Sequence, residues 1–398
     1  MCARYHLAFP KRRAHNVRPY KHTERMITMK RTLSFLLTAA LSLSLLAGCG
    51  PKNPPAGTSS SAPGSSSSQP DGSASEPGGN ASEGFTLPKV MVLSGPTGVG
   101  AAKLMADGDY AQEHLEETGI PMTPDGKVYV VDNITVVTDN TQVQAALNNK
   151  DVDIAAIATN AAASLYAKTD GGIQVLAVNT LGVLYILEKG DTVHAMADLA
   201  GKTLYAPSNT KGANPEHILN HLLEGSGVDP SQVSIEWLTP QEITVKMTSS
   251  DAGICMLPVP AATALLVKDS GVREAISLSD AWQDLEGSPL PMGCVVARTE
   301  YIEENPLGVE AFLAAYEKSI NYISDPANSA DASALVAQYE FAPNDQVAAK
   351  AIPQCSLTFV TGQEMKTTLE DYYTILFQTA PASIGGGLPY DSFYYGVD

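Results

Sequence analysis

The stretch that decides the fold is Asp153-Ile154-Ala155-Ala156-Ile157-Ala158, which runs directly into Thr159-Asn160 and an alanine-rich segment ending at Ala167. The short apolar run predicts a buried strand, and the segment from Asn160 to Ala167 predicts a helix. A second apolar run, Ile173 to Val178, follows closely. Strand, helix and strand in this order are typical of α/β layers, in which helices cover a sheet.

The same alternation continues along most of the chain. Short apolar runs predict further strands over residues 90–93, 128–137, 183–187, 203–206, 233–238 and 253–257. Helices are predicted over 141–149 and 260–268, and the last third carries apolar stripes at helical spacing that begin at Val309 and Met365. No internal repeat is evident. Residues 85–398 number 314, which exceeds the usual size of one core, so we expect two domains.

The N-terminal part predicts export from the cytoplasm. The basic pair Lys30-Arg31 precedes a 14-residue apolar run from Leu33 to Leu46, which Ala47-Gly48-Cys49 closes. A basic segment, an apolar segment and a small-residue exit are typical of a secretory signal peptide. A membrane-spanning helix would need about 20 apolar residues, and this run also carries serine and threonine. The tetrad from Leu46 to Cys49 resembles a bacterial lipobox, so we expect residues 1–48 to be removed and Cys49 to carry the lipid.

The segment upstream of the signal affects the charge balance. Residues 1–28 are basic and lack periodicity, and Met26 and Met29 offer better starts than Met1, so a mis-chosen start codon explains this extension most simply. Nine Lys or Arg and one Glu precede Cys49, which leaves 16 basic and 42 acidic residues and a net charge of −26. Such a chain repels nucleic acid and anionic lipid headgroups, so we expect neither as a partner. Membrane attachment would then rest on acyl chains.

A low-complexity segment separates Cys49 from the folded part. Residues 50–84 contain 23 Ser, Gly or Pro among 35, and large apolar side chains are nearly absent. Burial therefore cannot offset the entropy of ordering this stretch. We expect residues 49–84 to form the lipid-bearing end and a flexible linker with a reach of about 30–35 Å. The same residues are also compatible with a stalk that crosses the cell wall and has no specific partner.

Three motifs of the folded part carry a family resemblance. Asp198-Leu199-Ala200-Gly201-Lys202-Thr203 resembles a D-L-x-G-K motif, and Leu257-Pro258-Val259-Pro260-Ala261-Ala262 resembles an L-P-x-P-x-A turn, with Val259 where many members have Glu. Gly293 to Glu300 followed by Asn305-Pro306 resembles a return strand and the entry to C-terminal helices. In this order, behind a lipobox, they are similar to ABC-transporter solute-binding proteins of the branch for nitrate, sulfonates, taurine and thiamine precursors. The resemblance covers Val90 to Tyr395.

The resemblance implies a two-lobed periplasmic-binding-protein-like fold of type II, with mixed sheets flanked by helices and two crossover strands. Lobe one would comprise residues 85–181 plus 299–398, and lobe two residues 182–298. A ligand would bind in the cleft between the lobes and favour a closed state that a membrane permease recognises. We expect a monomer.

Loops at the carboxyl ends of strands are the candidate ligand contacts, because ligands gather there in open α/β sheets. In lobe one these are Ser94, Gly95, Thr97 and Gly98 after the first strand, Thr159 and Asn160 after the strand ending at Ala158, and Asn179 and Thr180 after the next. In lobe two they are Ser208, Asn209, Thr210 and Pro258, with Trp237 as a stacking surface. Glycine requirements, helix capping and turn chemistry explain the same polar residues without a ligand.

The arginine content bears on the kind of ligand. After removal of residues 1–48 only Arg273 and Arg298 remain, and Arg273 looks like part of a solvated turn while Arg298 could reach the cleft. Sulfonates, phosphates and dicarboxylates are usually held by a bidentate arginine. We therefore expect a small neutral or cationic organic ligand, a heterocyclic nutrient among the options, although helix N-termini can still hold one anionic group.

Enzymatic and metal functions lack support in the sequence. There is no G-x-S-x-G or H-E-x-x-H motif, and Ser94 to Gly100 completes neither a P-loop nor a dinucleotide fingerprint. His217 and His221 lie four apart without an evident third ligand, so we expect no metal and no cofactor. Cys255, Cys294 and Cys355 are expected to be buried reduced thiols. Two alternatives stay open: a lipoprotein sensor presenting its ligand to a receptor, and an enzyme on the same fold, as in thiamine or menaquinone precursor synthesis.

Overall fold

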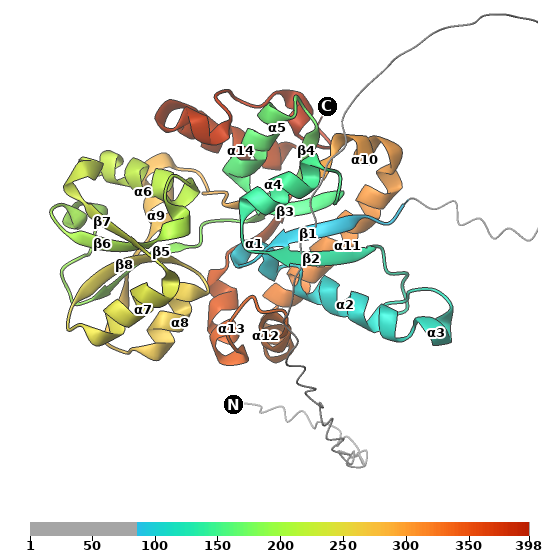
Figure 1. Ribbon diagram of the computed structural model, residues 1–398, viewed down its shortest axis with the longest axis horizontal. Coiled ribbons are helices and arrows are strands. Elements are labelled where there is room, and N and C mark those ends of the chain that lie inside the picture. Colours follow the sequence, from blue (N-terminus) through green and yellow to red (C-terminus); the bar gives the residue numbers. More distant parts are fainter. Residues whose placement is uncertain (1–85, 398) are drawn as a thin grey trace, which may run out of the picture. The chain divides into compact units, whose positions relative to one another are not determined.

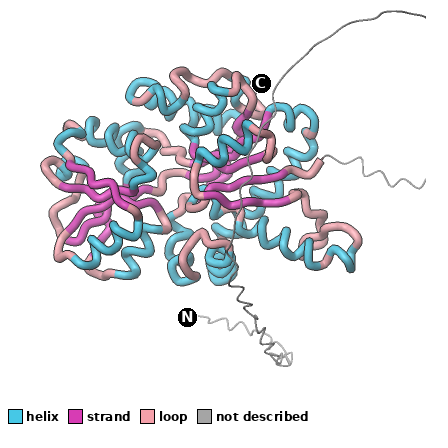
Figure 2. The backbone as a smooth tube through the Cα atoms, viewed as in Figure 1, coloured by secondary structure: helices cyan, strands magenta, loops and turns pink. Residues whose placement is uncertain are grey.

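The computed structural model describes residues 86 to 397, which contain two mixed β-sheets with helices on both faces (Figures 1 and 2). One sheet has six strands in the order β11-β4-β10-β3-β1-β2, and the other has five in the order β7-β6-β8-β5-β9. The predicted α/β fold class with two lobes is confirmed. The predicted signal peptide, Cys49 and the linker lie outside the described residues.

The six-stranded sheet forms the core of the first lobe (residues 86–180 and 293–397). Parallel strands lie on one side, with β1 between β2 and β3, while β10 runs antiparallel between β3 and β4. Its strands are β1 (Lys89–Leu93), β2 (Asn133–Val137), β3 (Ile154–Ala158), β4 (Ile173–Thr180), β10 (Gly293–Arg298) and β11 (Leu357–Val360).

The five-stranded sheet of the second lobe (residues 184–286) repeats this arrangement. Here β6 lies between its parallel neighbours β7 and β8, and β5 runs antiparallel between β8 and β9. Its strands are β5 (Leu184–Lys189), β6 (Thr203–Pro207), β7 (Ser234–Leu238), β8 (Gly253–Pro258) and β9 (Val272–Ser277). In each sheet the antiparallel central strand is the first one that the chain enters after crossing from the other lobe.

This topology corrects one predicted boundary. Residues 293–298 were expected in lobe two, but β10 pairs with β3 and β4 of the first sheet, for example with Cys294 opposite Ile157. Apolar side chains on both faces of β10 are buried, as a central strand requires. The chain therefore crosses between lobes at residues 181–183 and again at 287–292.

Helices cover both faces of each sheet (Figure 1). Those of the first lobe are α1 (Pro96–Val99), α2 (Ala102–Glu113), α3 (Leu115–Thr118), α4 (Asn140–Asn148), α5 (Thr159–Lys168), α10 (Thr299–Glu304), α11 (Pro306–Ser324), α12 (Ser329–Gln338), α13 (Asp345–Ala351) and α14 (Gly362–Thr379). Those of the second are α6 (Asn214–Gly225), α7 (Pro240–Ser249), α8 (Ala261–Lys268) and α9 (Leu278–Glu286). No helix among the described residues is both long and apolar enough to cross a membrane.

Local sequence explains where several helices begin and end. Thr239 and Glu242 form a reciprocal capping box at the start of α7, and Ser277 accepts a hydrogen bond from the Asp280 N–H at the start of α9. Gly287 ends α9 in the left-handed conformation that glycine favours. The three cysteines predicted to be buried thiols are buried and free.

Candidate ligand-binding site

A cavity of about 420 Å³ lies where the parallel strands of both lobes end. Residues that follow the carboxyl ends of β1, β2 and β3 form one side, and residues that follow β6 and β8 form the other. This is the place in open α/β sheets where ligands gather. The lining residues are Leu93, Ser94, Pro96, Thr97, Thr138, Asn140, Thr141, Gln144, Ala158, Asn160, Ala161, Ser164, Val183, Leu184, Asn209, Thr210, Gly212, Ala213, Asn214, Pro215, Pro258, Met292 and Ser383.

Six of the thirteen residues proposed from the sequence line this cavity. They come from four loops that are distant in the chain and that the two sheets bring together: Ser94, Thr97, Asn160, Asn209, Thr210 and Pro258. The expectation that ligand contacts lie at the carboxyl ends of strands therefore leads to this cavity.

The other seven proposed residues lie outside the lining. Gly98 has a packing role, because a Cβ there would lie 2.5 Å from a ring atom of Phe341. Gly95 adopts a φ of 95°, which glycine tolerates best, at the turn before α1. Ser208 is exposed, and Trp237 is a half-buried residue of β7.

Thr159 and Thr180 are buried behind the cavity and hold the second crossover. The Thr159 hydroxyl donates to the Pro291 carbonyl at 2.8 Å, and the Thr159 N–H donates to the Met292 carbonyl at 3.2 Å. The Met292 N–H donates to the Thr180 carbonyl at 2.9 Å, while the Thr180 hydroxyl donates to Asn179 Oδ1. Both threonines thus fix the backbone that carries Met292 into the cavity.

Asn179 holds the segment that follows β1 through a hydrogen bond to Thr97. Its Nδ2 donates to the Thr97 carbonyl at 2.9 Å and contacts the Tyr316 hydroxyl at 2.8 Å. Burial raises the pKa of Tyr316 to about 12, so this phenol stays neutral. The backbone at Thr97 is therefore held by a buried, uncharged network, and its side chain lines the cavity.

The sequence analysis did not propose the other lining residues, among them Thr138, Asn140, Gln144, Ser164, Asn214, Met292 and Ser383. Gln144 and Ser164 lie one turn inside α4 and α5, so they do not follow a strand directly. Asn214 is the first residue of α6, and Ser383 comes from the short 3-10 segment Pro381–Ile384 near the C-terminus. Strand-end reasoning could have found Asn214, but nothing in the sequence places Ser383 beside α5.

The lining has a uniform chemical character. Its polar side chains are hydroxyls and amides, and it includes no charged and no aromatic side chain. Trp237, proposed for stacking, is not among the lining residues. The cavity can therefore form hydrogen bonds and small apolar contacts with a ligand, but its side chains provide no ion pair.

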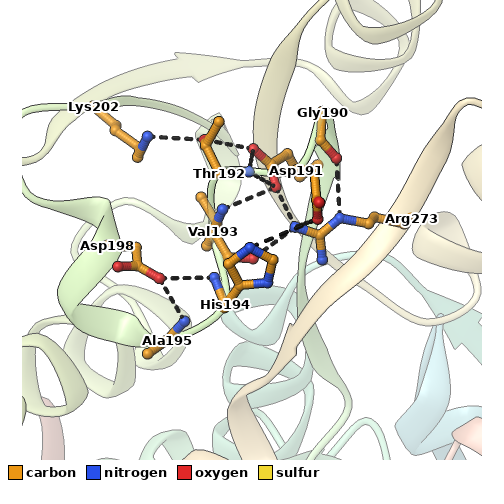
Figure 3. A network of polar contacts seen from close by, with 10 residues as sticks. Gly190, Asp191, Thr192, Val193, His194, Ala195, Asp198, Lys202 and Arg273 are labelled. Carbon is orange, nitrogen blue, oxygen red and sulfur yellow. Dashed lines mark hydrogen bonds and ion pairs between the residues drawn. The ribbon is translucent and has the colours of Figure 1, made fainter.

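Neither arginine of the described part supplies a charge to the cavity. Arg273 lies on β9, where it contacts Glu188 Oε2 at 2.5 Å and the Val193 carbonyl at 2.8 Å in the network of Figure 3. The expectation that Arg273 is part of a solvated turn was wrong. Arg298 contacts Asp153 Oδ1 at 2.6 Å. Asp153 directly precedes β3, so this ion pair lies at the end of the strand that is opposite to the cavity. The expectation that it could reach the cleft was wrong.

His221, one member of the histidine pair, contacts residues of α9. His221 Nε2 lies 2.6 Å from Glu286 Oε1, and its ring lies 5.1 Å from that of Trp282. Among residues 86–397, no group of three or more His, Cys, Asp or Glu side chains is placed to hold a metal ion.

Comparison with known proteins agrees with this geometry. A structure described as an ABC transporter from Parabacteroides distasonis superposes with a TM-score of 0.59 at 23% identity, over 78% of this chain and 98% of that one. The periplasmic aliphatic sulphonate binding protein from Escherichia coli superposes with a TM-score of 0.56 at 15% identity, over 73% and 91% of the two chains. The alkanesulfonate-binding protein from Xanthomonas axonopodis pv. citri, bound to MOPS, gives a TM-score of 0.53 at 14% identity, over 75% and 94%.

These likenesses define the class as the two-lobed fold of periplasmic binding proteins. The model of the NMT1/THI5-like family matches residues 130–329, half of the chain, and the chain belongs to that family. The branch suggested by the motifs is thereby confirmed. A candidate binding protein of Brucella abortus is 24% identical over 172 residues, 43% of this chain. The match spans about half, 52%, of that relative's length.

Proposed function

We propose that this protein is the extracytoplasmic solute-binding component of an ABC importer, and that it captures a small uncharged organic molecule between its lobes. The observation that carries the proposal is the cavity at the strand ends of both lobes, with its lining of hydroxyls and amides. A ligand held by both lobes stabilises the closed arrangement over the open one by the contacts that it makes with each. A permease that recognises the closed arrangement then receives only loaded protein.

Two features favour an uncharged ligand over a sulfonate or nitrate. The cavity has no arginine or lysine to pair with an anion, and both arginines of residues 86–397 have carboxylate partners elsewhere. The acidic balance of the chain also slows the approach of anions at low salt. Because no aromatic side chain lines the cavity, hydrogen bonds would select the ligand more than stacking would, and a heterocycle would be held by its edges.

Tethering through Cys49 forms part of the proposal. The signal geometry of residues 30–49 supports acylation of that thiol, and the Ser/Gly/Pro-rich stretch after it would act as the leash. We expect Cys49→Ala to release the protein from membranes or to leave an uncleaved precursor. A variant that stays on the membrane with an unmodified N-terminus would argue against the anchor.

Calorimetry tests the ligand class directly. We expect an uncharged probe such as uracil or cytosine to bind and taurine, MOPS and nitrate to fail. Thr97→Val, which removes a cavity hydroxyl and keeps the shape, should weaken binding about tenfold, whereas Ser208→Ala, outside the lining, should not. Tight binding of taurine or nitrate with no response to any uncharged probe would overturn the proposed ligand class.

The sensor alternative differs only in the partner that reads the closed state. A gene for a permease and an ATPase beside this one would favour import. Turnover of a bound probe would instead favour the enzyme alternative.

A further inference from the structure

Two side-chain amides of α4 line the cavity one helical turn apart. They belong to Asn140, the first residue of the helix, and to Gln144. Side chains at positions i and i+4 lie on the same face of a helix, with Cβ atoms about 5–6 Å apart. Asp139 fixes the start of this helix, because it accepts a hydrogen bond from the Thr141 N–H at 2.7 Å. Both amides are therefore placed to contact neighbouring atoms of one ligand.

Backbone groups at the junction of β3 and α5 fix the orientation of both amides. Asn140 Oδ1 accepts a hydrogen bond from the Ala158 N–H at 3.0 Å, and Gln144 Nε2 donates to the Ala161 carbonyl at 3.1 Å. A backbone N–H can only donate and a carbonyl oxygen can only accept. Neither amide can therefore be turned over without losing its backbone partner.

One atom of each amide remains available to a ligand. These atoms are Asn140 Nδ2, which is a donor, and Gln144 Oε1, which is an acceptor. Within residues 86–397 neither atom has a hydrogen-bond partner, since the backbone contacts engage the other atom of each amide. The buried unpaired side-chain atoms of that part of the chain are Trp282 Nε1 and the Tyr394 hydroxyl, so both amide atoms have surface open to solvent.

The two amides differ in this respect from the hydroxyls of the lining. A hydroxyl such as that of Ser94 or Thr97 rotates and can donate or accept, so it tolerates either kind of ligand group. An amide with a fixed orientation offers one kind of group only. A polar group of fixed identity selects strongly against a ligand that cannot pair with it.

We infer that Asn140 and Gln144 select the ligand, and that they recognise an edge with an acceptor oxygen beside an N–H donor, as in a primary amide, a lactam or a urea. This inference rests on the proposed function and deepens it. Asn140 Nδ2 donates to the oxygen of the ligand, and Gln144 Oε1 accepts from its N–H. An alkyl group in place of that hydrogen removes one hydrogen bond and leaves Gln144 Oε1 without a partner.

Paired probes test the edge by calorimetry. Uracil and nicotinamide carry a carbonyl beside an N–H, whereas 1,3-dimethyluracil and N,N-diethylnicotinamide keep the carbonyl and lack the N–H. The expected result is that the wild type binds uracil or nicotinamide about tenfold more tightly than the alkylated counterpart.

Two variants test the two residues. Asn140→Asp keeps an acceptor for the Ala158 N–H and replaces the available donor by a second acceptor. Gln144→Met removes the available acceptor at a similar side-chain length. Each variant should bind uracil or nicotinamide about tenfold more weakly than the wild type does.

Matched controls come from Gln142, an exposed residue of the same helix that lies outside the lining. Gln142→Glu and Gln142→Met should bind the probes as the wild type does. Asn140→Asp should also gain affinity for guanidinium, which only donates hydrogen bonds, whereas Gln142→Glu adds the same charge and should not. If Gln144→Met does not fold, Asn140→Asp with this gain decides alone.

The outcomes separate this inference from the proposed function. Equal binding of a probe and its alkylated counterpart, or unchanged binding in either folded variant, would overturn the inference and leave an uncharged ligand in place. Binding of nitrate or MOPS with no response to any uncharged probe would overturn the proposed ligand class and the inference together. Failure of both uracil and nicotinamide to bind also contradicts the inference, while binding of another uncharged probe would still support the proposed function.

Discussion

At the scale of single residues, the ion pair between Glu188 and Arg273 is the strongest candidate for a stabilising contact in the second lobe (Figure 3). Glu188 is 2% exposed and accepts hydrogen bonds from the Thr192 hydroxyl and the N–H groups of Thr192 and Val193. Burial alone would raise the pKa of Glu188, but these hydrogen bonds and the charge of Arg273 hold it below its usual value. The pair fixes the loop after β5 against β9.

We expect Arg273→Ala to lower the free energy of unfolding at pH 7 by about 3 kcal/mol, because it leaves a buried carboxylate unpaired. The folded-state pKa of Glu188 lies below its unfolded value, so this stabilisation is complete above the unfolded pKa and is lost as pH falls through the folded one. The variant should therefore begin acid unfolding at a higher pH than the wild type. Urea unfolding at several pH values measures both effects, with Lys211→Ala as the exposed control. A difference below 0.5 kcal/mol would show that the pair is not stabilising.

Single residues are also where the sequence was least informative. Arg273 and Arg298 were judged by their immediate neighbours in the chain, but Arg273 pairs with Glu188, 85 residues away, and Arg298 pairs with Asp153, 145 residues away. The cavity residues that were predicted, such as Ser94 and Asn209, follow strands directly, so strand recognition alone placed them.

At the scale of elements, α1 depends on a close approach to β1. A Cβ at Gly98 would lie 2.4 Å from the Leu93 carbonyl oxygen and 2.5 Å from a ring atom of Phe341. Both the strand end and the helix bear cavity residues, Ser94 and Thr97. The glycine is thus needed for packing and positions the site without lining it.

We expect Gly98→Ala to destabilise the protein by about 1–3 kcal/mol through overpacking and to weaken binding of a ligand that wild type binds, since α1 must shift. Gly387→Ala is the matched control, because nothing lies within 4 Å of its Cβ position. Chemical unfolding and calorimetry give the two readouts. If Gly98→Ala is as stable as the wild type, the Phe341 side chain moves aside and α1 keeps its position.

Most elements were predictable because apolar runs and helical stripes are local signals. The exceptions have physical reasons. Only the second half of the predicted strand 128–137 forms β2, while Val128 pairs instead with Met122 in an isolated bridge. Strands β9 and β11 were missed, since β9 mixes charged residues with apolar ones as an edge strand of its sheet and β11 is four residues long.

At the scale of the whole described molecule, the sequence predicted two lobes but not the contacts that join them. Tyr372 of α14, in the first lobe, donates to Asn214 of α6, in the second, and its ring lies 5.7 Å from that of Trp282 on α9. All three side chains are buried. Residues 158 positions apart in the chain form this hydrogen bond, so no local pattern could reveal it.

The neighbouring tyrosine provides an internal control for the role of this contact. Tyr373 donates to the Thr159 carbonyl at 2.9 Å, and both of those residues belong to the first lobe. Either Tyr→Phe change removes one buried hydrogen bond, which costs about 1 kcal/mol. Only Tyr372→Phe removes a hydrogen bond between the lobes, and it takes the Tyr372 donor away from Oδ1 of the cavity-lining Asn214.

We therefore expect Tyr372→Phe and Tyr373→Phe to lose similar stability but to differ in lobe arrangement. The chain has two tryptophans, so a Trp237→Phe background leaves Trp282 as the only one and its fluorescence reports on the contact with Tyr372. Tyr372→Phe should shift this emission to longer wavelength and enlarge the radius of gyration in solution scattering, because the lobes separate more readily. Tyr373→Phe should change neither. If both variants leave emission and radius unchanged while losing stability equally, the Tyr372–Asn214 hydrogen bond adds to folding alone and does not hold the lobes together.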